Sequence, residues 1–443
     1  MANLLNLPPE LITRICSHLC IHCYAWHSST TPPEAWYNEG CTLMGMSKIK
    51  ALAALSLTCK TLRIFAQPYL YHFPSTILRF PSLLRTLACN KDLASNVRHL
   101  AIRYWDDEEG EQLLAQHGEM IHQLAMEVCH DAQGNLLPTA PGWFLDRDSQ
   151  PRGIQCNSPE LMNRELLANL GFQLVPNLER LYVETKYDSF HGFYHPDAFQ
   201  ALTELVIENR DTEFAFDLDD FKTLLAAAPK LHTLRGIKVS GIKRGLYHDA
   251  VKELRLKSSC MDSEAFTSAM EAFPQLERFF YNSGGVIIPG RREATPGMIE
   301  EAILIKKATL KHLEVQLDGA AYYSMEGGST IHSLKAMQVL ETLKLDSDCL
   351  YDEIENESTT DGTLLTNLLP GSLRSFELAR PNSHIYQDIA QLARVADDVF
   401  PNLERVRISG TSRQKENKLR ERLCDTQRVQ WLWGGGGYEG ERW

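Results

Sequence analysis

The residues best suited to chemistry lie near the N-terminus, where cysteines and histidines alternate. Cys20 and Cys23 form a C-x-x-C pair, and His22 lies between them. Thiolate sulfur and imidazole nitrogen are the ligands that zinc prefers in structural sites. Further residues of these two types lie close by in the sequence, at Cys16, His18, His27 and Cys41. The segment therefore contains enough ligands of the right type for one tetrahedral zinc site.

Two observations argue against such a site. Cys16 falls on the apolar face of a predicted helix, where it is accounted for by packing. Structural zinc sites usually present two paired knuckles, and only Cys20/Cys23 qualifies here. The sequence therefore predicts no structural zinc, and from it we assign no metal ligand and no cofactor.

Motifs of the common hydrolases and nucleotide-binding enzymes are absent from the sequence. It contains no G-x-S-x-G elbow, no Walker loop and no H-E-x-x-H. Asp217, Asp219 and Asp220 cluster, but they precede a predicted helix, where acidic residues act as caps. The sequence therefore predicts that the chain is not an enzyme, and an enzyme with an N-terminal zinc module is the least favoured of the functional classes.

Composition excludes further classes. The 443 residues carry a net charge of −12, which disfavours nucleic acid and anionic membranes as partners. No run of eighteen apolar residues occurs, and the N-terminus lacks the basic region of a signal peptide. The odd number of cysteines, 11, fits a reducing compartment. We therefore expect a cytoplasmic or nuclear protein.

The elements that carry the Cys/His segment are predicted helices. Pro8 and Pro9 suit the first turn of a helix that runs to Leu19, and Leu11, Ile15 and Leu19 recur on one face. A second helical segment is expected from Ser47 to Phe73, with Ser47 as its cap and Pro68 as its end. Two or three short helices cannot bury this much apolar surface among themselves, so a partner is predicted.

These residues resemble the F-box of filamentous fungi. The phrases that carry the resemblance are L-P-P-E-L from Leu7 and L-S-x-T-C-K-x-L-R from Leu55. The resemblance covers residues 1–73, with a long connection at about 20–46, and implies docking onto the Skp adaptor of a cullin ubiquitin ligase. The adaptor-binding residues that it implies are Leu7, Pro8, Leu11, Ile15, Leu19, Leu55, Leu57 and Leu62.

From Pro74 onward a repeated phrase of the type L-x-x-L-x-L dominates. Successive phrases from Leu178 are about 20 to 34 residues apart, the range of leucine-rich repeats. In each phrase the apolar residues alternate as expected for a strand buried on one face. The phrases begin at Val97, Leu178, Leu202, Leu231, Val251, Leu276, Leu310, Leu340, Leu373 and Leu403.

Helices are predicted between the phrases. They are expected at Asp219–Ala228, Asp262–Phe273, Thr295–Ala308 and Ile385–Phe400, and several are followed directly by proline and the next strand. Other predicted features of the chain are a helix at Glu111–Val128, an irregular loop at 131–159, a last helix at Arg413–Leu423, a capping segment at Val429–Trp433 and a Gly-rich tail at 434–443.

The predicted fold is therefore α/β, with an N-terminal helical F-box and an irregular leucine-rich-repeat solenoid over 74–433. Its parallel strands would line the concave side and its helices the outside. The alternative fold, a doubly wound α/β enzyme, would need a Gly-rich phosphate loop after an early strand, and none occurs. The resemblance to leucine-rich-repeat F-box proteins implies a substrate receptor, and the alternative is a scaffold that works without ubiquitin transfer.

The residue between the two inward positions of each phrase should point to solvent. Together these residues form a column that begins at Tyr182 and Val206, and they include aromatic and arginine side chains typical of binding hot spots. The predicted contacts for an unknown protein target are Tyr182, Arg235, Arg255, Phe280 and Arg407. An acidic or phosphorylated segment of the target would suit this column.

Overall fold

The structure is a computed structural model of the chain. It describes residues 4–23, 39–74, 80–102, 115–121, 123–124, 127, 167–185, 198–211, 214–284, 293–317, 330–351, 362–382, 385–411 and 428–435. These residues fall into two compact units. The first comprises Met1–Val206 and Phe221–Leu231, and the second comprises Ile207–Asp220 and His232–Glu439.

The first unit begins with a helical module. A short 3-10 turn, η1 (Leu4–Asn6), precedes α1 (Pro9–Leu19), so the predicted first helix is confirmed. Pro8 takes the N-cap position with extended backbone, and Glu10 lies in the first turn, where its charge suits the helix dipole.

The predicted second helix is wrong in its details. It consists of two helices, α3 (Glu39–Thr58) and α4 (Lys60–His72), that meet at Cys59. The thiol of Cys59 caps α4 by accepting a hydrogen bond from the Leu62 N–H at 3.5 Å. Pro68 lies inside α4 and does not end it. The helix α3 also begins before Ser47, within the stretch expected to be an irregular connection.

The module has an apolar core of its own. Helices α1, α3 and α4 contact one another in this core. Its fully buried members are Ile12, Cys16, Cys20, Leu52, Leu62 and Ala66. Cys16 is therefore a packing residue, as its helix position predicts. Two further helices, α5 (Phe80–Cys89) and α6 (Lys91–Ser95), follow the module and were not anticipated from the sequence.

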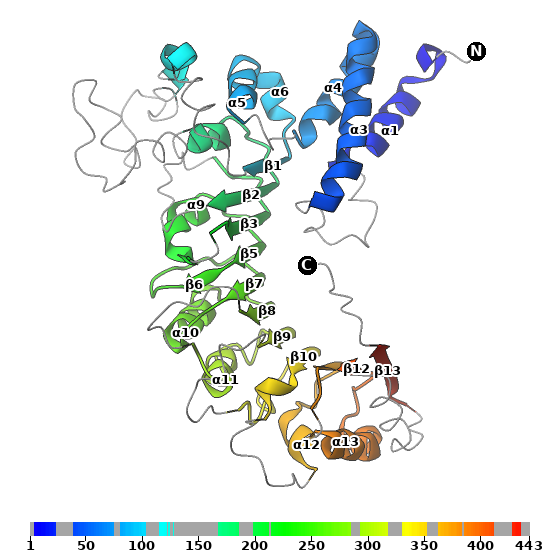
Figure 1. Ribbon diagram of the computed structural model, residues 1–443, viewed down its shortest axis with the longest axis vertical. Coiled ribbons are helices and arrows are strands. Elements are labelled where there is room, and N and C mark those ends of the chain that lie inside the picture. The colour runs from blue at the N-terminus through cyan, green and yellow to red at the C-terminus, as the bar shows by residue number, and fades with distance from the viewer. Residues whose placement is uncertain are drawn as a thin grey trace, which may run out of the picture. The chain divides into compact units, whose positions relative to one another are not determined.

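Eleven strands form one parallel sheet in the order β1-β2-β3-β5-β7-β8-β9-β10-β11-β12-β13 (Figure 1). The strands of the first phrases are β1 (His99–Ile102), β2 (Arg180–Thr185), β3 (Glu204–Asn209), β5 (Thr233–Ile237), β7 (Glu253–Ser259) and β8 (Arg278–Ser283). Those of the later phrases are β9 (His312–Gln316), β10 (Thr342–Asp346), β11 (Ser375–Ala379) and β12 (Arg405–Thr411). Each of the ten phrases thus forms a strand, and the α/β class is confirmed.

The eleventh strand, β13 (Gln430–Gly435), overlaps the predicted capping segment and extends into the start of the expected tail. A separate pair of short parallel strands is formed by β4 (Phe216–Asp217) and β6 (Val239–Gly241).

Helices connect many of these strands. The four predicted helices are found as η4 (Leu218–Phe221) with α9 (Lys222–Ala226), α10 (Ser263–Ala272), α11 (Pro296–Leu304) and α13 (Tyr386–Val399). Two further helical segments were not predicted, namely η6 (Ser347–Cys349) and α12 (Leu364–Leu368). Asp262 caps α10 and Thr295 caps α11, each accepting a hydrogen bond from a backbone N–H in the first turn. The helices α10 and α11 contact each other on one side of the strands (Figure 1).

Several predicted features lie outside the described residues. They are the irregular loop at 131–159, the last helix at 413–423 and the tail beyond Gly435. Of the helix predicted at Glu111–Val128, residues 115–121 are described and helical. Among the described helices, none has both the length and the apolar character needed to cross a bilayer.

Candidate functional site

The residues implied in adaptor binding fall into three groups by their exposure in the structure. Pro8, Leu11 and Leu57 are exposed, and Leu11 and Leu57 keep 46% and 76% of their surface accessible. Leu62 is buried in the core of the module, so its side chain does not lie on the surface, contrary to expectation. The remaining members are partly buried, namely Leu7, Ile15, Leu19 and Leu55.

Two large exposed apolar residues in the described part of the module were not among the predicted ones, Leu5 on η1 and Ile64 on α4. Ile64 on α4 keeps 72% of its surface accessible, because it lies on the side of the helix opposite Leu62 and Ala66. The module therefore combines a buried core with large apolar side chains on its surface.

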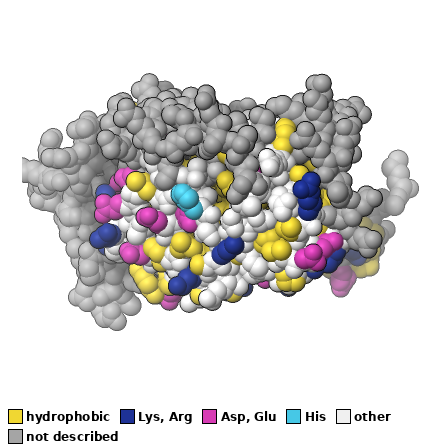
Figure 2. All heavy atoms as spheres, turned by 90° about the horizontal axis from the view of Figure 1, so that it is seen from below, with side chains coloured by type: hydrophobic (Ala, Val, Ile, Leu, Met, Phe, Trp, Pro, Cys, Tyr) yellow, Lys and Arg dark blue, Asp and Glu magenta, His cyan; other side chains and the backbone are white. Residues whose placement is uncertain are grey.

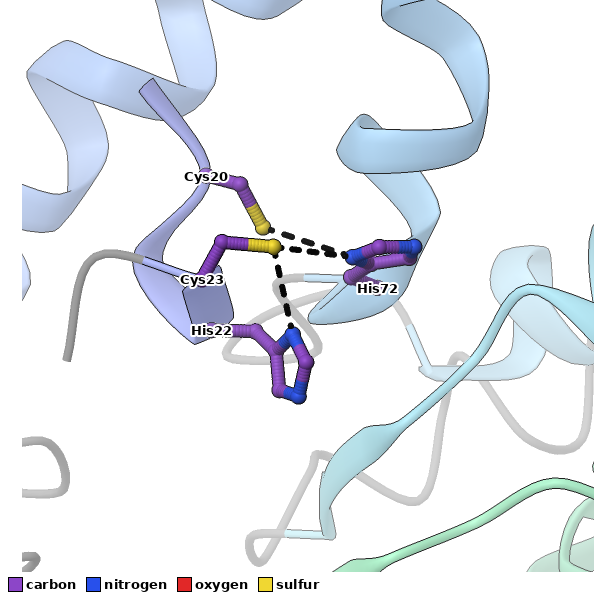
Figure 3. A group of neighbouring side chains, drawn as sticks. All are labelled: Cys20, His22, Cys23 and His72. Carbon is purple, nitrogen blue, oxygen red and sulfur yellow. Dashed lines mark hydrogen bonds between the residues drawn. The ribbon is translucent and has the colours of Figure 1, made fainter. Parts of the chain in front are cut away.

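A Cys/His cluster lies where α1 and α4 end (Figure 3). It is defined by Cys20, His22, Cys23 and His72, and one ligand atom from each lies within 4.8 Å of the others. The sulfurs of Cys20 and Cys23 lie 3.7 and 3.5 Å from Nδ1 of His72. The sulfur of Cys23 also lies 3.5 Å from Nδ1 of His22. Two sulfurs and two nitrogens thus converge on one point.

The end of α1 places the two cysteines. Cys20 is the C-cap residue of α1, and its N–H donates to the carbonyl groups of Cys16 and Ser17 at 2.9 and 3.2 Å. Its side chain is buried in the module core, and that of Cys23 packs against the same core. The apolar core of the module therefore supports the cluster, because both cysteines contact it.

The cluster is connected to residues that precede and begin the first strands. Nε2 of His22 lies 3.4 Å from a carboxylate oxygen of Glu179, and Arg98 lies 3.7 Å from the other. Glu179 and Arg98 directly precede β2 and β1. The ring of the buried His99 meets that of His22 edge-on at 4.5 Å between centroids.

Hydrogen bonds shift the pKa values of the two cysteines of the cluster in opposite directions. The Cys20 thiol donates to Cys23, which lowers the pKa of Cys23 to about 3 and raises the pKa of Cys20 well above its usual range. Burial lowers the pKa of His22, but its hydrogen bonds with Cys23 and Glu179 outweigh burial, and the net shift is upward. The same bond to His22 lowers the pKa of Glu179, and burial holds the pKa of His99 well below its usual range.

His72 is the member of the cluster that sequence reasoning missed. It lies 49 positions beyond Cys23, and nothing in the spacing links the two. The candidate ligands predicted from the sequence include Cys20, His22 and Cys23, which belong to the cluster, together with Cys16, His18, His27 and Cys41. In the structure Cys16 and His18 lie on α1 outside the cluster, and His27 and Cys41 lie outside the residues whose side chains are described.

The residues of the predicted column lie in register on neighbouring strands of the second unit. Arg235 pairs with Arg255, Arg255 with Phe280 and Phe280 with Glu314 on neighbouring strands. The series continues through Lys344, Glu377 and Arg407. We call these seven residues, from Arg235 to Arg407, the middle column.

The side chains of the middle column interact with one another. The guanidinium of Arg255 stacks on the ring of Phe280 at 3.8 Å and binds Glu253 at 2.5 Å. Lys344 lies 2.9 Å from Glu314 and 3.9 Å from Glu377. Arg407 lies 3.8 Å from Glu377. Charges of opposite sign thus neutralise much of the column.

The exposure expected for the target-binding residues is only partly found. Tyr182 and Arg235 keep 3% and 8% of their surface accessible, so these two are buried and not solvent-facing. Arg407 is exposed, and Arg255 and Phe280 are half-buried. Figure 2 shows a face on which the described acidic, basic and apolar side chains are interspersed, without a large area of one charge.

Comparison with known proteins adds no family. Neither the scan against family models nor the search of the curated proteins finds a match for this chain.

Proposed function

We propose that the chain is an F-box substrate receptor, which docks onto the Skp adaptor of a cullin ubiquitin ligase through its helical module. The observation that carries the proposal is the surface of this module. Leu11 on α1 and Leu57 on α3 are exposed although the module already has a buried core. Exposed leucines beside a complete core suit a protein contact, in which burying one side chain contributes about 1.5–3 kcal/mol.

The parallel sheet supports the second half of the proposal. Its strands recur at leucine-rich-repeat spacing and align the middle column over seven consecutive strands, from β5 to β12. A repeat sheet of this kind offers an extended surface to a protein target. The proposed mechanism is proximity, because a receptor that holds its target near the ubiquitin-charged enzyme raises the effective concentration of target lysines.

The compensated charges refine the expected target. Because Lys344 lies between two glutamates, and Arg255 is bound to Glu253, the middle column lacks the unshared positive charge that a phosphate group needs. A target that contacts the half-buried Phe280 and the exposed Arg407 fits this column better than a multiply phosphorylated one.

The experiment that tests adaptor docking uses the full chain with Leu11→Asp and Leu57→Asp combined. Because both side chains are exposed, the fold should persist while co-purification of the Skp adaptor falls by at least about 100-fold. Val399→Asp, at a similarly exposed apolar residue of α13, is the matched control and should leave adaptor binding unchanged. Unchanged adaptor binding by the double variant would refute docking through this surface.

The alternative, a scaffold that binds the adaptor without ubiquitin transfer, makes the same docking prediction. Inhibition of cullin neddylation separates the two. Partners of a receptor should accumulate on the purified chain, whereas partners of a scaffold should stay constant.

A further inference from the structure

We propose that Cys20, His22, Cys23 and His72 form a structural Zn²⁺ site that joins the helical module to the first strands of the sheet. This inference is independent of the proposed function, because it concerns how the first unit is held together.

The distances suit a tetrahedral zinc ion. Zn–S and Zn–N bonds of about 2.3 and 2.0–2.1 Å at the tetrahedral angle place each sulfur about 3.5–3.6 Å from each nitrogen. Three of the four sulfur–nitrogen pairs of the cluster lie at 3.5, 3.5 and 3.7 Å. Figure 3 shows the sulfurs of Cys20 and Cys23 side by side and both facing the ring of His72.

Hydrogen bonds alone account less well for this arrangement. A single imidazole nitrogen either donates one proton or accepts one, yet Nδ1 of His72 faces both sulfurs. Convergence of two sulfurs on one nitrogen follows directly if all three bind a central ion. Two thiolates also neutralise the double charge of zinc, so a partly buried site would carry no net charge.

The surroundings of His22 match those of a metal-binding histidine. Such a residue usually donates its second ring N–H to a carboxylate, which fixes the ring and its tautomer. Nε2 of His22 faces Glu179 at 3.4 Å, so Nδ1 remains for the metal. Arg98 in turn holds the carboxylate of Glu179 at 3.7 Å.

The site would connect three parts of the first unit. Cys20 caps the end of α1 and Cys23 lies in the helical segment 21–23 that follows it. His72 is the last residue of α4, and Glu179 directly precedes β2. The backbone makes the same connection, because the carbonyl of His72 accepts the N–H of Arg98 at 3.0 Å. Zinc at this junction would lock the module onto the sheet.

The test is elemental analysis of the full chain, expressed with zinc and purified without chelator. We expect about one zinc per chain. Cys23→Ser and His72→Asn should each abolish it, and Glu179→Gln should weaken zinc affinity by about 10- to 100-fold. Matched controls are Cys59→Ser, which retains a capping oxygen for α4, and His18→Asn on α1. Both controls should keep the zinc.

A second measurement does not depend on the folding of variants. Co²⁺ added to the metal-free wild-type chain should give the intense visible bands of a tetrahedral cobalt–thiolate site. Bound zinc should also protect the partly buried Cys23 from alkylation, whereas the exposed Cys89 should react equally with and without metal.

Three results would overturn the proposal. One is the absence of both stoichiometric zinc and cobalt–thiolate bands, which would leave a hydrogen-bonded thiolate–imidazole network. The second is zinc that persists in folded Cys23→Ser and His72→Asn. The third is equal alkylation of Cys23 in zinc-loaded and metal-free protein.

Discussion

The helical module and the sheet of the second unit bury apolar residues in different ways. The module relies on one small core in which three helices meet. The sheet repeats the same contact, because a buried side chain of each strand is in register with that of the next. This buried row consists of Leu234, Leu254, Phe279, Leu313, Leu343, Phe376 and Val406.

The difference teaches where each region is vulnerable. In the sheet, each buried side chain is supported by two neighbouring strands, so packing is distributed along the repeat. In the module, the few residues of one core bear all the packing, and Cys20 belongs both to that core and to the Cys/His cluster. We therefore expect the module to depend on its polar junction far more than the sheet does.

The largest effect on stability is expected within the buried row. Phe279→Ala should lower the free energy of unfolding by about 3–5 kcal/mol, because a fully buried ring is replaced by a cavity beside Phe266. The adjacent Phe280→Ala is the matched control, since its half-buried side chain belongs to the middle column on the other face of the strand. Chemical denaturation should show a clearly smaller loss for Phe280→Ala, and equal losses would contradict the assignment of the two faces.

A similar pair of variants tests the core of the module. Leu62→Ala should lower the free energy of unfolding of the module by about 2–4 kcal/mol. Ile64→Ala, two positions away on the opposite side of α4, should change it by less than about 0.5 kcal/mol. Hydrogen exchange of the α1 and α4 amides is the appropriate measurement, because it detects opening of the module alone. Faster exchange throughout the sheet of the second unit as well would show that the two regions are not separable in this way.

Charge pairs should matter less than either core. Lys344→Ala would leave Glu314, which is only 7% exposed, close to Glu377 without the ammonium group between them. We expect a loss of about 1–2 kcal/mol in chemical denaturation. Lys252→Ala, which removes an exposed ion pair with Glu277 at 3.7 Å, should have no measurable effect. An equal loss of unfolding free energy in Lys252→Ala and Lys344→Ala would contradict the expected difference between an exposed and a buried charge pair.

The smallest expected effect is a pH dependence at Glu277. The hydrogen bond from Lys311 lowers the pKa of Glu277 below its ordinary value of 4.5. A lowered carboxyl pKa stabilises the fold above that ordinary value, and the stabilisation is lost as pH falls and the group is protonated. Glu277→Gln should therefore melt slightly below wild type at pH 7, and the gap should close in acid. A gap that widens in acid would contradict the assignment.

Much of the sheet could be predicted from the sequence, because strands with one buried face repeat apolar residues at every second position. The same alternation predicted the register from Arg235 to Arg407. Burial of Tyr182 and Arg235 could not be read from it, since alternation tells which face a side chain takes but not what covers that face.

The helical module was harder to predict. Pro68 was expected to end a helix, yet it lies inside α4, because packing of the helix outweighs the missing N–H. His72 could not be linked to Cys20 and Cys23, because only the folded chain brings the ends of α1 and α4 together.

His72 has a consequence beyond the cluster. The outer edge of β1 begins the sheet, and the edge of a sheet is where a strand from another molecule can add. The carbonyl of His72 accepts a hydrogen bond from the N–H of Arg98, just before β1. The carbonyl of Arg98 in the same way accepts the N–H groups of Glu179 and Arg180, just before and at the start of β2. At this one position the end of α4 thus makes the backbone hydrogen bond that a preceding strand would make. Loss of the last turn of α4 should free this N–H at the edge of the sheet, where pairing with a strand of another molecule would begin.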